Sequence, residues 1–152
     1  MSGGVVMSRG ARIAPYHEEL LAAADRYIAA DGHTDRQVAV VLAQTAAEIR
    51  IEQAFDVLRQ RIEPVAVREW TSRRLRPGYS LRSDDVKHLW NALSERKINE
   101  GQVWTDYRAV IELRGEVVHK GRPVSSAQAK EAVRAVRAFL PRVEAEVFTP
   151  PT

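Results

Sequence analysis

The sequence contains no cysteine and no long hydrophobic run. The absence of cysteine excludes disulfide bonds and thiolate metal sites, and it suits a reducing, cytoplasmic compartment. No apolar stretch approaches the ~20 residues that cross a bilayer, which argues against a membrane location. The first fifteen residues, "MSGGVVMSRGARIAP", lack the apolar core of a signal peptide, so we expect a disordered tail over residues 1–15.

The composition that remains is ordinary for a globular domain. The chain has 152 residues, of which 45% are hydrophobic and 28% charged, which predicts one domain with a real core. A net charge of +3 permits an anionic partner without requiring one. The bias towards alanine, arginine and valine indicates the coding preference of a bacterium with GC-rich DNA.

Helical periodicity of apolar residues extends through most of the chain and predicts an all-α fold. We expect an antiparallel bundle of about five helices over residues 16–148, with a frayed end at 149–152. The first helix is predicted over 16–30. The second starts at the N-cap Thr34, with Gln37 in the capping-box position, and continues unbroken until shortly before Pro64.

Cap residues mark the later helices. Ser83 caps a third helix. A fourth covers "VWTDY" to "VVH" and ends before Gly121. Ser125 or Ser126 caps a fifth, whose apolar stripe consists of Ala129, Val133, Val136, Leu140, Val143 and Val147.

The segment "EPVAVREWTSRRLRPGYSLR" is predicted to be one long basic connection with at most a short turn. It contains two prolines, a Pro-Gly pair and five arginines, which disfavour a helix. Trp70 and Tyr79 lie in it, either to stack on nucleic-acid bases or to pack beneath the loop.

An arginine interrupts the apolar face of the fourth helix. At about 100° per residue, Trp104, Tyr107, Ile111 and Val118 form one stripe, and Arg114 falls inside it. A buried arginine keeps its charge, so it needs a partner or a task. His119 follows five residues later, about 140° away on an ideal helix. The two side chains can converge if the helix distorts or if a symmetry mate supplies a second pair.

The stretch "ELRGEVVHKG" resembles the R-x4–6-H motif of the HEPN superfamily (higher eukaryotes and prokaryotes nucleotide-binding). The motif lies in the penultimate long helix of a small all-α domain, and a glycine follows "H-K", as is common in that family. The long early helix, with acidic residues on an apolar face, is also similar to the family's first core helix. The resemblance covers residues from about 34 to 148.

The resemblance implies a metal-independent endoribonuclease of a toxin or antiviral system, acting as a dimer whose paired motifs share one cleft. His119 would transfer protons at the ribose 2′-OH and the leaving oxygen. Arg114 would stabilise the charge on the phosphorane. Two positions depart from the family pattern: Gly115 follows the arginine where Asn, Asp or His is common, and Gly121 replaces the tyrosine of the subgroup that is paired with a nucleotidyltransferase.

A buried Arg114 calls for a counter-charge, and three carboxylates of the second helix are candidates. Glu52 is predicted to point towards the core and is our first choice as the supporting partner. Glu48 is the second choice and Asp56, one turn further on, the third. The alternative is that these are solvated residues at the edge of the helix.

Basic residues occur near the motif and elsewhere. They are either solvated surface groups or contacts to a phosphate backbone. Lys120, Arg122, Lys130, Arg134, Arg137, Arg73 and Arg74 are the predicted RNA-binding set.

Other chemistries find little support. The four histidines, His17, His33, His88 and His119, have no metal-ligand spacing, and no glycine-rich phosphate loop is present, so we expect no metal and no cofactor. The leading hypothesis is a toxin or phage-defence endoribonuclease that acts as a homodimer on RNA, with an antitoxin or another defence protein as a partner. The alternative is a non-catalytic HEPN-like module that binds RNA, nucleotide or protein. A third hypothesis is a helical interaction protein in which Arg114 forms a structural ion pair.

Overall fold

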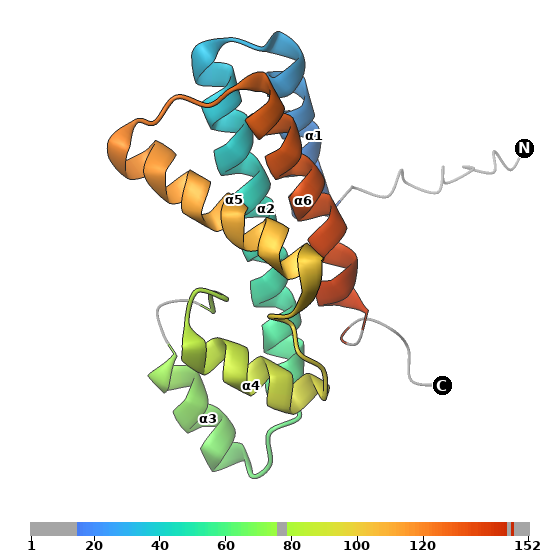
Figure 1. Cartoon of the computed structure of the whole chain (residues 1–152). Helices are drawn as coiled ribbons and strands as arrows, with labels where there is room; N and C mark the ends of the chain where they lie inside the picture. The colour runs from blue at the N-terminus through green and yellow to red at the C-terminus, as the bar shows by residue number, and fades with distance from the viewer. Residues whose placement is uncertain (1–14, 76–78, 146, 148–152) are drawn as a thin grey trace, which may run out of the picture.

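The computed structural model describes residues 15–75, 79–145 and 147, which form six α-helices and contain no strand. Figure 1 shows two helical hairpins packed together, α1 (Tyr16–Ala30) with α2 (His33–Arg59), and α5 (Gly101–Lys120) with α6 (Ser126–Glu144). Helices α3 (Val65–Arg74) and α4 (Asp84–Ser94) lie at the C-terminal end of α2. The predicted all-α class is confirmed, while residues 1–14 of the predicted tail and the predicted frayed end lie outside the described residues.

Helix α2 is the centre of the bundle and packs against α1, α4, α5 and α6. Its buried face is rich in small side chains, which allow neighbouring helix axes to approach closely. The fully buried alanines are Ala39, Ala43, Ala46, Ala47 and Ala54.

Aromatic rings join the helices at both ends of the bundle. The ring of Tyr107 on α5 stacks on that of Phe139 on α6, with 4.3 Å between centroids. Trp104 meets the same Phe139 at 5.9 Å. Beyond the crossing, Phe55 of α2 contacts the ring of Tyr79 at 4.8 Å. Tyr79 is therefore half-buried against the core, which favours the packing role over base stacking.

Local cap chemistry fixes most helix ends where it was predicted. Ser83 Oγ accepts a hydrogen bond from the Val86 amide, and Ser125 Oγ accepts one from the Gln128 amide at 3.1 Å. The predicted Thr34 cap is wrong. Helix α2 begins at His33, and the Gly32 amide donates to Asp35 Oδ2 at 3.1 Å. Asp35 therefore occupies the capping-box position, and Gln37 is free for another contact.

The segment predicted to be a connection contains helix α3, so that prediction is wrong for residues 65–74. Thr71 is the single buried residue of this helix. Val65, Val67 and Trp70 are exposed. Because its apolar side chains do not face the core, α3 shows no amphipathic periodicity that points to a helix.

Candidate functional site

Helix α5 carries Arg114 on its inner side and His119 on its outer side. Arg114 is half-buried, and the buried residues Val110 and Val117 lie within about 60° of it on an ideal helix. His119 lies in the last turn and is exposed. The structure therefore does not bring the two predicted catalytic side chains together within one chain.

The predicted apolar stripe of α5 is only half right. Trp104 and Tyr107 are buried, as expected. Further along, Val110 and Val117 face the core, while Ile111 is half-buried and Val118 is 49% exposed. Figure 1 shows the reason: α5 crosses α2 and α6 obliquely, and its C-terminal end leaves the bundle.

Contacts between α2 and α5 show that the two helices run antiparallel. Near the start of α2, the Gln37 side-chain amide donates to the carbonyls of Gly121 and Arg122 at 3.3 and 2.9 Å. Further along α2, the carboxylate of Glu48 lies near enough to the Tyr107 phenol to raise its pKa. Arg114 lies midway between Tyr107 and Gly121, and therefore opposite the part of α2 between Gln37 and Glu48.

The predicted ion pair between Glu52 and Arg114 is wrong. Glu52 lies about one turn beyond Glu48, away from Arg114, and its side chain is exposed. The Arg114 Nε atom is buried, and the described residues supply no hydrogen-bond partner for it. The other two carboxylates are engaged elsewhere: Glu48 Oε1 accepts from Gln44 Nε2 at 2.9 Å, and Asp56 pairs with Arg59 at 3.3 Å.

A polar group of Gln44, Glu48 and Tyr107 lies inside the α2–α5 contact. Burial raises the pKa of the Tyr107 phenol, and the negative charge of Glu48 raises it further. The buried Oε1 atom of Gln44 has no hydrogen-bond partner within the described residues. Sequence reasoning missed Gln44. The signal for it was one amide within the run "AVVLAQTAA", which is otherwise apolar apart from a threonine.

A strip of apolar and small residues separates Arg114 from His119 on the surface of α5. Going around an ideal helix from Arg114, one meets Val118, Ile111 and Gly115 before His119. A Cβ atom added to Gly115 would meet nothing within 4 Å. Gly115 is therefore not required by packing within the chain, and the strip can admit a close neighbour.

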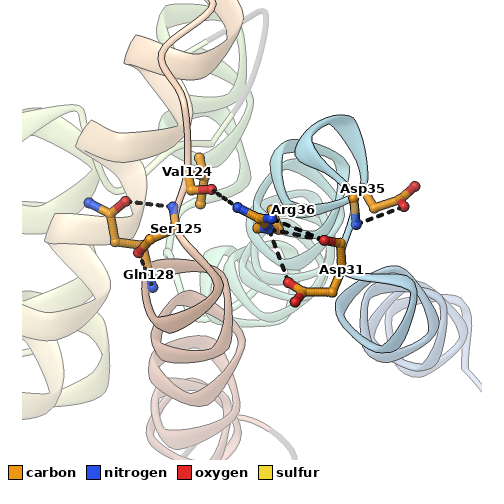
Figure 2. A network of polar contacts seen from close by, with 7 residues as sticks. Asp31, Asp35, Arg36, Val124, Ser125 and Gln128 are labelled. Carbon is orange, nitrogen blue, oxygen red and sulfur yellow. Dashed lines mark hydrogen bonds and ion pairs between the residues drawn. The ribbon is translucent and has the colours of Figure 1, made fainter.

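The loop that follows His119 is fixed to the start of α2. Figure 2 shows the Arg36 guanidinium between Asp31 and Val124. Arg36 Nε donates to Asp31 Oδ1 at 3.0 Å, and Nη1 donates to the Val124 carbonyl at 3.3 Å. With the Gln37 bonds, these contacts hold the C-terminal end of α5 at a fixed place although that end leaves the bundle.

The predicted RNA-binding residues fall into two groups. Three are engaged with carboxylates: Arg122 with Glu116, Arg134 with Glu131 and Asp106, and Arg137 with Asp25. The others are exposed and make no hydrogen bond or ion pair within the described part of the chain: Lys120, Lys130, Arg73 and Arg74.

The residues that the structure describes contain no cluster of three or more His, Asp or Glu side chains that could hold a metal ion. His33 and His88 are exposed, whereas His17 is buried beside Glu144, with 3.8 Å from its Nε2 to Oε1. Within the same residues, no helix is long and apolar enough to cross a membrane. Comparison of the chain with models of known families, with curated proteins and with solved structures gave no match.

Proposed function

We propose that the chain is a metal-independent endoribonuclease of the toxin or phage-defence type, which cleaves RNA in a cleft shared by two copies. The observation that carries this proposal is Arg114, a half-buried guanidinium that no carboxylate in the described chain neutralises. A cation held in a partly desolvated place attracts an anion strongly, and a guanidinium matches the geometry of a phosphate.

Two copies are needed because Arg114 and His119 diverge by about 140° on α5. The strip of Ile111, Gly115 and Val118 lies between them and is apolar, small and only partly covered. Packing this strip against its symmetry mate across a two-fold axis would place both histidines and both arginines around one cleft.

In the proposed reaction, His119 of one copy takes the proton of a ribose 2′-OH. The 2′ oxygen attacks the adjacent phosphorus, the bond from phosphorus to the 5′ oxygen breaks, and His119 of the second copy protonates that oxygen. Arg114 stabilises the extra negative charge of the phosphorane. The products carry a 2′,3′-cyclic phosphate and a 5′-hydroxyl.

The divergence of Arg114 and His119 within one chain also favours a second candidate, a helical module that binds RNA, nucleotide or protein without cleaving it. One experiment separates the two. The purified protein is incubated with total RNA in EDTA, and the ends of any fragments are identified. Fragments with cyclic phosphate and 5′-hydroxyl ends are expected, and intact RNA would leave the binding module as the remaining function.

A further inference from the structure

Helix α3 turns an aromatic side chain towards solvent. Trp70 is 62% exposed, whereas the other two tryptophans of the chain, Trp90 and Trp104, are 2% and 8% exposed. Val67 is exposed as well, and on an ideal helix it lies about 60° from Trp70. Leaving an indole in water forgoes the stabilisation that its burial would give, so packing among the described residues does not account for this surface.

Two guanidinium groups follow Trp70 within one turn. On an ideal helix Arg73 lies about 60° to one side of Trp70, and Arg74 lies about 40° to the other. Both are exposed, and neither forms a hydrogen bond or ion pair within the described residues. Glu69, one turn before Arg73, does not pair with it either.

This pattern differs from that of the other arginines that were predicted to bind RNA. Arg134 Nη2 lies 2.9 Å from Asp106 Oδ2, and Arg137 Nη1 lies 2.8 Å from Asp25 Oδ1. A phosphate would have to displace those carboxylates. On α3 there is no such competition within the described chain, so Arg73 and Arg74 are available to an anionic partner.

We propose that the α3 surface of Val67, Trp70, Arg73 and Arg74 binds single-stranded RNA. An unpaired base stacks on the Trp70 indole, and the guanidiniums of Arg73 and Arg74 contact the phosphates on either side of it. A duplex hides its base faces, so the surface discriminates for unpaired segments. The inference rests on the proposed function only in taking RNA as the ligand.

The α3 surface is distinct from the candidate cleft. Figure 1 shows α3 at the C-terminal end of α2, whereas the C-terminal end of α5 lies in the opposite half of the molecule. An RNA chain bound at Trp70 is therefore held by a segment away from the scissile bond. This arrangement adds affinity for substrates that carry an unpaired stretch at some distance along the RNA from the cleavage site.

The test uses the full chain with His119→Ala, so that no cleavage accompanies binding. Trp70 is the one largely exposed tryptophan, and stacking on a base should quench its emission when an unstructured oligouridine is added. A duplex of the same length should quench far less. The affinities of the variants are compared by the fluorescence anisotropy of a labelled oligouridine. In this measurement Trp70→Ala should weaken binding by about five- to a hundredfold, and Trp70→Phe, which keeps a ring, should restore most of it. Replacing Arg73 and Arg74 by glutamine should flatten the salt dependence of binding, while Arg26→Gln, at an exposed cation of α1 outside the predicted RNA-binding set, serves as the control.

Unchanged affinity in Trp70→Ala, or equal quenching by the duplex, would overturn the proposal. So would self-association of the chain that depends on Trp70 and is indifferent to RNA, since that would mark a protein contact. Trp70-dependent binding of oligouridine, together with a natural chain that does not cleave RNA, would refute the proposed function alone. Cleavage without Trp70-dependent binding would refute this inference alone.

Discussion

Arg114 carries a charge that no carboxylate in the described chain balances. Its Nε atom is buried and has no hydrogen-bond partner among the described residues, which costs folding free energy compared with leaving that group in water. A half-buried cation that is unfavourable for folding is suited to an anionic ligand, which in the proposed function is a phosphate. The stability of Arg114 variants separates this account from a structural ion pair.

The first prediction is that Arg114→Met does not destabilise the fold. Methionine keeps an unbranched chain of similar reach and removes the charge, so the free energy of unfolding should be unchanged or higher by up to about 1 kcal/mol. Breaking a buried ion pair would instead cost ~3–5 kcal/mol. Urea denaturation followed by circular dichroism distinguishes the two. A loss of more than about 2 kcal/mol would mean that Arg114 has a structural partner.

Gly115 gives the second prediction at this scale. Glycine inside a helix costs ~1 kcal/mol compared with alanine, and an added Cβ would meet nothing within 4 Å. Gly115→Ala should therefore raise the free energy of unfolding by about 0.5–1 kcal/mol, while it weakens self-association and cleavage by filling the strip. Gly121→Ala is the matched control. Its backbone φ of 62° disfavours a side chain, so that variant should be less stable.

If the Gly115→Ala variant cleaves RNA at the full rate and has a higher melting temperature, a second copy does not approach closely at this position. The strip would then not be the contact between two copies.

Among the helices, α1 depends on a buried histidine that the sequence did not single out. Burial lowers the pKa of His17, the nearby Arg50 lowers it further, and the carboxylates of Glu144 and Glu18 oppose the shift. Arg50 Nε and Glu144 Oε1 lie 2.8 Å apart, so an ion pair between α2 and α6 faces the imidazole. The folded chain therefore favours the neutral form of His17 beside this ion pair.

The third prediction follows from the direction of that pKa shift. The unfolded chain titrates near 6.5 and the folded chain below it, so the unfolded state binds the proton first as the pH falls. The contribution of neutral His17 is fully present above about pH 6.5 and is lost as the pH falls towards the folded-state pKa. Thermal melts at a series of pH values should show this loss in the natural chain and a flatter profile in His17→Gln. If the melting temperature falls with pH equally in the natural chain and in His17→Gln, the prediction is wrong. His33→Gln, at an exposed histidine, is the control.

Local chemistry made several elements predictable, and tertiary contacts decided the rest. Cap residues and periodicity act within a few residues of chain, so the sequence correctly predicted the helix Tyr16–Ala30, the cap Ser83 and a helix end before Gly121. Of the two serines expected to cap the last helix, the structure selects Ser125. Helix α3 was missed because its apolar residues face solvent. Glu52 was misplaced because its distance from Arg114 depends on how far α5 is shifted along α2, and its exposure on which helices cover α2. No local sequence pattern contains either.

For the candidate site, too, local sequence patterns were readable and contacts between helices were not. Arg114 and His119 stood out from the sequence by spacing and context. Whether Arg114 has a partner, and whether Trp70 or Tyr79 is free, depends on packing between helices. The two aromatic residues differ in the structure: Tyr79 packs on Phe55, and Trp70 faces solvent.

At the scale of the whole molecule, the proposed shared cleft requires two copies in one assembly. The fourth prediction is that the chain forms a homodimer through the strip of Ile111, Gly115 and Val118. Val118→Glu should yield a folded monomer, because Val118 is 49% exposed and contributes little to the core. Val57→Glu, at an exposed valine 39% accessible on α2, should remain dimeric. Light scattering at micromolar protein is the measurement, and a monodisperse monomer of the natural chain would exclude the shared cleft.

The rate of cleavage of one defined RNA in EDTA, measured for the natural chain, His119→Ala and His88→Ala, tests the central claim most directly. All three should give the same helical circular dichroism, because both histidines are exposed. We expect the natural chain and His88→Ala to cleave at similar rates, and His119→Ala to be slower by a factor of about 100 or more. Cleavage by His119→Ala at the rate of the natural chain, or none by the natural chain, would contradict it.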